Sequence, residues 1–384
     1  MSNSLERNVN FQIDLAKPDD DAAIRRLLAT NAVPGRVTVT YEREPNYFAG
    51  CATMGMTCQS LVARAGDRIV GVACRATRQM FVNGREVRIG YLGQLRIDER
   101  FRGRWLVSRG FRFLNQLHDD DPTPAYLLSL IDENREALGV LIERRRPGFP
   151  VFRQIGLLYT LALTLGQPGR TKVERSMYCE IERAGHDDLP GIIDFLRRRG
   201  AARQFYPAYT QDDFRGAATL GFRPEDFFVA RRNGEIVGVI GLWDQSGYKQ
   251  TIVRGYAGWL RWARPAYNIA ARLSARAPLP NAGEKILSAY ASFVCVAGAD
   301  PEVFRALLRR VCALAAERGY SYLMAGFDER DPLLEVARAH PHIAYLSRVF
   351  IAGWPAGLDD QPNQFERFYE QLDDRIPYFE IAAL

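Results

Sequence analysis

VARAGDRIVGV, residues 62–72, returns as VARRNGEIVGV at residues 229–239, with V-A-R and I-V-G-V in the same register 167 positions further on. Each copy places two β-branched runs around a Gly-Asp or an Asn-Gly pair, which is the pattern of a β-hairpin. Because a hairpin can recur by chance, the flanking sequence decides whether the similarity extends to a whole fold.

The flanks repeat as well. A short strand and a helix that starts with acidic residues precede each hairpin, within residues 11–29 and 177–200. Downstream, AYLLSLIDENREALGVL (125–141) aligns with SYLMAGFDERDPLLEVA (321–337) at a spacing of 196 residues. The spacing between copies has therefore grown by 29 residues, which indicates an insertion in the second copy at about 247–280.

We therefore predict two copies of one α/β (α+β) fold, each a mixed, mostly antiparallel sheet flanked by helices. TLGQPGRTKVERS, at 164–176, has the turn residues and charges of a linker between them. The predicted parts are a first domain at 1–167, a second at 173–355 and a C-terminal tail at 356–384.

Composition limits the classes of function. The chain has 384 residues, of which 47% are hydrophobic, and a net charge of +6 that favours anionic partners. No compact Lys/Arg block indicates a specific nucleic-acid ligand, and the longest uncharged run (155–169) is too short for a transmembrane segment. Six scattered cysteines and no signal-peptide pattern lead us to expect a reducing cytoplasm, and no His or Cys spacing predicts a metal site.

The stretch IDERFRGRWLVSRGF (97–111) joins a strand to a helix through one glycine set between arginines. A helix start of this kind presents backbone N–H groups and a favourable dipole to an anion. Arg100, Arg102 and Arg104 would add positive charge there, as a phosphate site requires. The alternative is a helix N-terminus surrounded by solvated arginines.

This order of elements, with LRIDERFRGRWL at 95–106, resembles the GNAT superfamily of acyl-CoA N-acyltransferases. In that family a strand of pattern L-x-V-x-P runs into an R-G-x-G-x-G/A loop that holds the pyrophosphate of acetyl-CoA. Leu95 and Ile97 occupy the strand positions, and Arg102 and Gly103 match the first pair of the loop. Asn134, with Ala137 and Gly148-Phe149 after it, resembles the later helix-and-strand pattern of the family.

The resemblance implies acetyl-CoA or another acyl-CoA as co-substrate, no metal, and pantetheine lying along the strand at 95–97. The residues expected to bind the cofactor are Leu95, Arg96, Ile97, Arg100, Arg102, Gly103, Arg104, Trp105, Leu106, Val107 and Asn134.

The sequence departs from the family pattern at four positions. Trp105 and Val107 replace small residues of the loop, Glu99 replaces the common proline, and Leu141 replaces a tyrosine that usually protonates the leaving thiolate. Trp105 either packs in the core as the first apolar residue of the helix or lies against coenzyme A. We expect the second.

The second copy resembles a degenerate member of the same family. Its loop, VAGADPEVFRALL (296–308), places Asp300 and Glu302 where the pyrophosphate would lie, and two carboxylates repel an anion. We therefore expect one acyl-CoA site, in the first domain.

Direct transfer to an amine requires a base for the amine and an acid for the thiolate. Asp98, Glu99 and Asp132 are candidate bases at strand ends, with helix capping as the alternative for each. Tyr126 is the candidate acid, Tyr91 is a second candidate, and a place in the core is the alternative for both.

We therefore expect an N-acyltransferase that moves an acetyl group from acetyl-CoA to an amine of an unidentified acceptor, acting as a monomer or homodimer. Two alternatives stay open: a Fem-type peptidyl transferase that uses aminoacyl-tRNA, and a catalytically inactive acyl-CoA-binding or regulatory module. Within the insertion, Trp259, Trp262 and Ile269 alternate with arginines, which favours ordinary packing, with a lid or a membrane-surface helix as alternatives.

Overall fold

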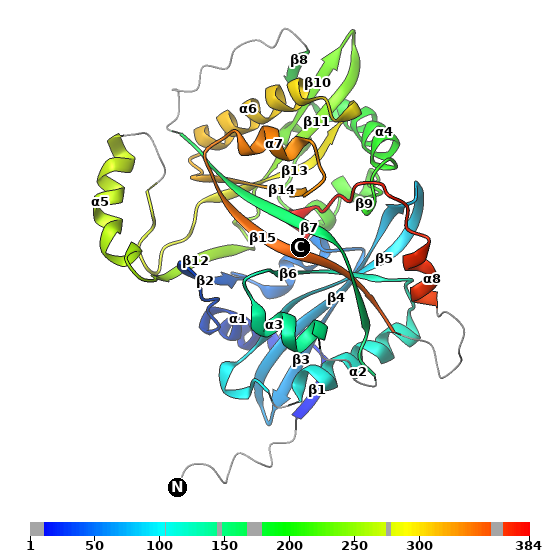
Figure 1. The fold of residues 1–384 in the computed structure, drawn as a ribbon, viewed down its shortest axis with the longest axis vertical. Helices are drawn as coiled ribbons and strands as arrows, with labels where there is room; N and C mark the ends of the chain where they lie inside the picture. Colours follow the sequence, from blue (N-terminus) through cyan, green and yellow to red (C-terminus); the bar gives the residue numbers. More distant parts are fainter. Residues whose placement is uncertain (1–10, 104, 144–147, 167–178, 274–277, 355–363) are drawn as a thin grey trace.

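The computed structural model describes residues 11–103, 105–143, 148–166, 179–273, 278–354 and 364–384. Within these ranges, thirteen strands form one continuous sheet in the order β1-β3-β4-β5-β6-β15-β7-β14-β13-β11-β10-β8, with β9 paired to β4 off this path. Two further strands, β2 and β12, form a separate ribbon (Figure 1). This mixed, mostly antiparallel sheet flanked by helices confirms the predicted fold class.

The first half of the chain supplies the strands β1 (Phe11–Leu15), β2 (Val37–Glu42), β3 (Thr57–Ala65), β4 (Arg68–Val82), β5 (Arg85–Ile97), β6 (Tyr126–Ile131) and β7 (Val151–Thr164). Its helices are α1 (Asp21–Thr30), α2 (Leu106–Asp120) and the single turn α3 (Arg135–Ala137).

The second half supplies the strands β8 (Glu180–Arg183), β9 (Tyr206–Pro207), β10 (Phe227–Arg232), β11 (Glu235–Trp243), β12 (Gln250–Tyr256), β13 (Ser288–Val296), β14 (Tyr322–Asp328) and β15 (His342–Gly353). Its helices are α4 (Leu189–Gly200), α5 (Leu260–Leu273), α6 (Pro301–Glu317), α7 (Leu333–Arg338) and α8 (Gln364–Glu370).

The two halves use the same strand order. β1, β3, β4 and β5 are antiparallel neighbours followed by parallel β6, and β8, β10, β11 and β13 are antiparallel neighbours followed by parallel β14. The quoted hairpins are β3–β4 and β10–β11, in which Gly71 pairs with Ala63 and Gly238 pairs with Ala230. The register shifts directly after Ala63 and directly after Ala230. The similarity between the quoted stretches therefore extends to their pairing.

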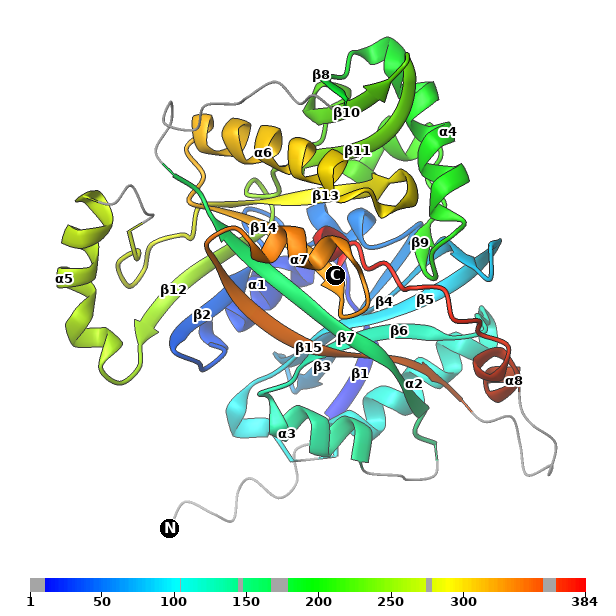
Figure 2. The same ribbon diagram turned by 45° about the horizontal axis from the view of Figure 1, so that its top comes forward.

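The halves are joined by an exchange of their last long strands. β15 of the second half lies between β6 and β7 of the first half, and β7 lies between β15 and β14 (Figures 1 and 2). Each half thus completes its sheet with a strand from the other, which the sequence did not predict. The expected domain boundaries at 167 and 173, and most of the expected linker, lie outside the described residues.

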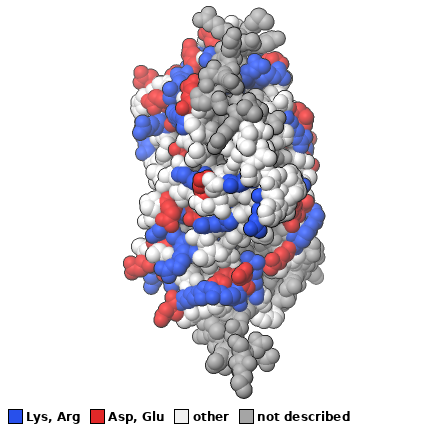
Figure 3. Space-filling view, turned by 90° about the vertical axis from the view of Figure 1, so that its left-hand side faces the viewer, with Lys and Arg blue, Asp and Glu red and all other residues white. Residues whose placement is uncertain are grey.

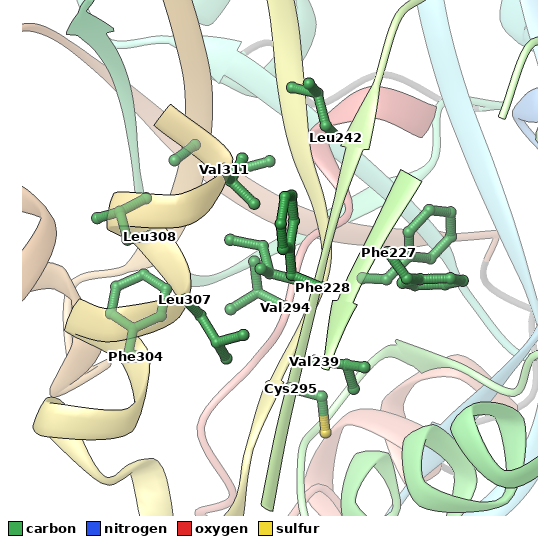
Figure 4. Packing of buried hydrophobic residues seen from close by; sticks show 14 of the residues in the cluster. Phe227, Phe228, Val239, Leu242, Val294, Cys295, Phe304, Leu307, Leu308 and Val311 are labelled. Carbon is green, nitrogen blue, oxygen red and sulfur yellow. The ribbon is translucent and has the colours of Figure 1, made fainter. Parts of the chain in front are cut away.

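The core of the second half is continuous and rich in aromatic residues (Figure 4). Phe227 and Phe293 are fully buried, and the Phe293 ring stacks on Trp243 with the ring centres 5.5 Å apart. On α6, Phe304 and Leu307 are buried at the spacing of one helix face, as the apolar periodicity of that segment predicts. Burial of each such side chain stabilises the fold by about 1.5–3 kcal/mol.

The insertion does not pack as expected. Its strand β12 pairs with β2 of the first half, and α5 follows at the edge of the molecule (Figure 1). Trp259 is 76% exposed, Trp262 is 79% exposed and Ile269 is 64% exposed, so the expectation of ordinary packing is wrong for these three. The reason is that α5 turns the small residue Ala271 inward instead. Seen from the α5 side, uncharged surface is bordered by Lys and Arg atoms (Figure 3).

The C-terminal segment runs back into the centre of the molecule (Figure 2). Residues 377–383 are buried, and Ile381 lies so close to Gly326 of β14 that a Cβ at that glycine would come within 2.3 Å of the isoleucine side chain. None of the described helices combines the length and the hydrophobicity that crossing a membrane requires.

Candidate functional site

β5 and β6 separate after a short parallel contact. They pair at Gly90 with Tyr126 and at Tyr91 with Leu127, after which β6 continues along β15 and β5 continues along β4. Gln94 has a positive φ of 56° and lies where the register between β4 and β5 shifts, so the strand bulges at this point. Residues 92–97 of β5 therefore have a strand neighbour on one side only, and we call them the open edge.

The loop after the open edge is held by ion pairs. Asp98 is nearly buried and accepts hydrogen bonds from Arg68 at 2.6 Å and from Arg100 at 2.8 Å. Arg102 reaches Asn31 at 3.4 Å and Glu136 at 3.6 Å, and so ties the loop to the turn that follows β6. The expected phosphate ligand Arg100 is thus engaged by Asp98, whereas Arg104 lies outside the described residues.

Backbone conformation at the helix start suits a bound anion. Gly103 has φ of 75°, which favours glycine, and a Cβ there would meet no atom within 4 Å. Trp105 also has a positive φ of 62°, is 66% exposed and stands just before α2, so it does not pack in the core. No side chain caps the first turn of α2, so its N–H groups are open to an anion.

The remaining expected cofactor residues take different positions. Leu95 is 38% exposed on the open edge, and the Arg96 guanidinium lies over the Tyr41 ring. Ile97 and Leu106 pack together in a small apolar cluster, and Val107 packs in a neighbouring one, so only their backbone can meet a cofactor. Asn134 accepts a hydrogen bond from the Ala137 N–H and so caps α3.

In the second half, the positions that correspond to the open edge and to the uncapped start of α2 are both occupied by groups of the chain itself. The Asp300 carboxylate accepts hydrogen bonds from the N–H groups of Glu302 and Val303 and so caps α6. β13 and β14 also separate, after Tyr290 and Met324, but here the C-terminal segment fills the space. Glu380 accepts the N–H of Phe293, the residue at the β13 bulge, and the Tyr378 hydroxyl accepts the N–H of Val294. The second copy therefore has no free edge and no free helix start.

We call the part of the open edge at the Gln94 bulge, next to the point where β5 and β6 separate, its inner end. The four predicted catalytic residues are not placed for acid–base work there. Asp98 is held by arginines, and Glu99 is exposed. Asp132 bonds Arg348 at 2.6 Å, and this hydrogen bond lowers the pKa of Asp132. Tyr126 is fully buried, where its hydroxyl lies 3.0 Å from Arg75 and 3.1 Å from His118. Ion pairing engages Asp98 and Asp132, and burial encloses Tyr126, so the roles expected from the sequence do not fit these three.

The inner end of the open edge is instead lined by residues that the sequence did not single out. The Gln94 amide nitrogen donates to the Met54 sulfur, and the Tyr47 hydroxyl lies 3.4 Å from the Gln94 carbonyl oxygen. Arg43, which directly follows β2, is only 7% exposed, and Lys249 directly precedes β12, the strand that pairs with β2. Burial, with Arg43 as the second cause, lowers the pKa of Lys249 to about 7.

No motif marks Arg43 or Lys249, because their proximity depends on a ribbon between segments 206 residues apart. In the part of the chain that the structure describes, no three His, Cys, Asp or Glu side chains form a group that could hold a metal ion.

The fold is that of the GNAT superfamily of acyl-CoA N-acyltransferases. It has the strand order of that fold, a separated pair of central strands, and a glycine loop that joins a strand to a helix start. Solved structures with this fold superpose on the chain. N-myristoyltransferase of Saccharomyces cerevisiae with bound myristoyl-CoA superposes with a TM-score of 0.60, at 11% identity over 96% of this chain and 90% of that one. A GCN5-related N-acetyltransferase from Sphaerobacter thermophilus gives 0.55, at 14% identity over 89% and 95%.

The glucosamine N-acetyltransferase region of a fungal multi-domain β-N-acetylglucosaminidase gives a TM-score of 0.59 at 14% identity, over 91% of this chain and 38% of that one. Comparison of the sequence with protein-family models and with curated proteins gives no match. The chain therefore has the GNAT fold over most of its length, as the resemblance predicted.

Proposed function

We propose that the protein is an N-acyltransferase that takes an acyl group from acyl-coenzyme A and passes it to an amine. The observation that carries the proposal is the contrast between the halves. The open edge and the uncapped start of α2 are both free in the first half, whereas Asp300 and the C-terminal segment block the corresponding positions in the second. A tandem duplication in which one copy kept the cofactor site accounts for this difference.

In this proposal the pyrophosphate of coenzyme A lies on the loop at Gly103 and on the first N–H groups of α2. The amide-rich pantetheine arm pairs with the open edge as an added strand would. This direction places the thioester near the bulge at Gln94, at the inner end of the edge. The amine nitrogen attacks the thioester carbonyl carbon, the C–S bond breaks, and the thiolate leaves with the proton that the amine releases.

Isothermal titration with acetyl-CoA and, separately, with myristoyl-CoA tests the proposal, with an aminoacyl-tRNA as the third ligand. We expect one acyl-CoA molecule per chain, with the preferred chain length given by the tighter of the two. Binding of aminoacyl-tRNA alone would favour the Fem-type alternative. Acyl-CoA binding without N-acyl product from a panel of amines, followed by mass spectrometry, would favour the regulatory module.

A further inference from the structure

The helix of the insertion, α5, turns an apolar side away from the protein. Its exposed residues recur at the spacing of one helix face, and together with the residue directly before the helix they are Trp259, Trp262, Pro265, Ala266 and Ile269. We call these five residues the tryptophan face. A helix that packs on a core has the opposite arrangement, with its apolar stripe turned inward and its polar residues in water.

The inner side of α5 is held to the protein by polar contacts. The Asn268 side chain donates to the Leu279 carbonyl oxygen at 3.0 Å and accepts the Leu279 N–H at 2.8 Å. The Arg264 guanidinium donates to the Pro280 carbonyl oxygen at 3.0 Å and lies over the Tyr256 ring. These contacts fix the orientation of the helix, so the fold itself keeps the tryptophan face outward.

The position of α5 leaves this face accessible. The helix packs on β12 and lies at the edge of the molecule in both ribbon views (Figures 1 and 2). The space-filling view from that side shows uncharged surface next to Lys and Arg atoms (Figure 3). Two neighbouring exposed indoles with apolar residues beside them are typical of an interaction site, whereas single exposed apolar side chains are common on any surface.

The surroundings of the tryptophan face are basic. Residues 254–273 include four arginines and no Asp or Glu. Arg261 is exposed and its guanidinium lies over the Trp262 ring, with 5.5 Å to the ring centre. Arg36 is also exposed, and its carbonyl oxygen accepts the Ala257 N–H just before the tryptophan face begins. Neither arginine forms an ion pair with another residue in the described ranges.

The acids of the neighbouring segments have partners of their own. Glu42 of β2 pairs with Arg254, and the Glu284 carboxylate accepts hydrogen bonds from the N–H and the side-chain amide of Asn281. The positive charge beside the tryptophan face therefore remains available to an anionic partner.

Charge decides between two kinds of partner. A second copy of this chain in a symmetric contact would place the same face against itself, and so would bring Arg261 toward its own counterpart with no acid of the face to compensate. An anionic lipid surface suits both parts of the face. Indoles prefer the boundary between apolar chains and headgroups, and lipid phosphates attract arginines at the same depth.

We propose that the tryptophan face binds the protein to an anionic lipid surface, with α5 lying in the plane of the boundary and with Arg261 and Arg36 among the headgroups. The inference does not rest on the proposed acyl transfer. It explains why the insertion exposes two tryptophans and an isoleucine while it turns an arginine and an asparagine inward.

Flotation of the full chain with vesicles tests the proposal. One set of vesicles contains phosphatidylcholine alone, and the other contains equal amounts of phosphatidylcholine and phosphatidylglycerol. Each arginine near an anionic surface contributes roughly a factor of five to binding, so we expect at least about tenfold tighter binding to the anionic vesicles. A double variant with Trp259→Ser and Trp262→Ser should lose most of this binding, and Arg261→Gln should weaken it about fivefold.

Arg198→Gln is the matched control for charge. Arg198 is an exposed arginine of α4, which lies across the molecule from α5 (Figure 1). This variant changes the net charge as Arg261→Gln does but should bind vesicles like the wild type. The double tryptophan variant should keep the wild-type melting temperature, because both replaced side chains are exposed.

Fluorescence gives a second readout of the same contact. Phosphatidylcholine with brominated chains, mixed with phosphatidylglycerol, should quench the wild-type tryptophan emission. The double variant keeps Trp105, Trp243 and Trp354, and its emission should not be quenched.

Equal binding to the two kinds of vesicle, or binding that the double tryptophan variant retains, would overturn the inference. A dimer that light scattering detects in the wild type and not in the double variant, without binding to either vesicle, would overturn it in favour of a second copy.

Discussion

The Asp300 carboxylate accepts the backbone N–H of Glu302 at 2.9 Å, and together with the hydrogen bond from Val303 this contact closes the helix start that its counterpart α2 leaves open. Asp300→Ala should lower the free energy of unfolding by about 1 kcal/mol, the usual cost of a lost N-cap, in urea denaturation. Asp300→Asn, which keeps a capping oxygen, should cost less. Neither variant should bind a second acyl-CoA, because Glu380 and Tyr378 still fill the β13 edge. Two molecules bound per chain of Asp300→Ala would contradict this account.

Gly103 offers the sharpest test of the cofactor loop. Gly103→Asp places a carboxylate where the pyrophosphate is expected, and we predict that titration detects no acyl-CoA binding. Gly103→Asn has the same size and accepts the positive φ of 75° equally well, so it is the matched neutral control and should retain measurable affinity. Loss of binding in both variants to the same degree would mean that bulk, and not charge, is excluded at this position.

Trp105 occupies a left-handed backbone position while exposing 66% of its surface. Trp105→Gly should therefore leave the free energy of unfolding unchanged or raise it by about 1 kcal/mol, because glycine takes this conformation without strain. If the indole lies against coenzyme A, the Kd of acyl-CoA should change in the same variant. A loss of several kcal/mol of stability would instead show that the side chain is a core residue.

Lys249 makes stability depend on pH. Its pKa falls to about 7 in the folded protein because of burial and Arg43, while an unfolded lysine titrates near 10.4. Between these values the unfolded chain binds more protons than the folded one, so the free energy of unfolding rises with pH from about 7 to about 10. Lys249→Met should reduce this slope in urea titrations between pH 6.5 and 9. An identical slope in both proteins would show that Lys249 keeps an ordinary pKa.

Local pattern was enough to predict much of the fold. The hairpin around Gly66 and the hairpin around Asn233 and Gly234 follow from turn residues that accept positive φ, and the start of α2 follows from the strand–glycine–helix stretch at 97–111. The loop at 98–105 follows from its glycine and charges. These features depend on interactions between residues that are close in the sequence, which is why the sequence alone predicts them.

The exchange of β7 and β15 could not be predicted in this way. β7 and β15 pair with each other from His342 with Leu163 to Gly353 with Val151, and segments so far apart in the chain carry no local signal for this pairing. The candidate site also depends on contacts between segments that are far apart in the chain, so the sequence did not predict it. Arg43 directly follows β2 and Lys249 directly precedes β12, and neither position has a pattern that distinguishes it from an ordinary surface cation. Conversely, Asp98 and Asp132 looked available in the sequence because their arginine partners come from pairing across the sheet.

The exchanged strands also govern the order in which the molecule can be finished during synthesis. β6 is complete at Ile131, yet the neighbour that covers its outer edge begins only at His342. At about 5–20 residues per second, a ribosome needs roughly ten to forty seconds to cover that distance. Throughout this interval the nascent first half carries an uncovered strand edge, of the kind that recruits other chains. A product released early therefore has the cofactor loop but an unfinished sheet, and chaperone binding or proteolysis of such fragments is the expected fate of interrupted translation.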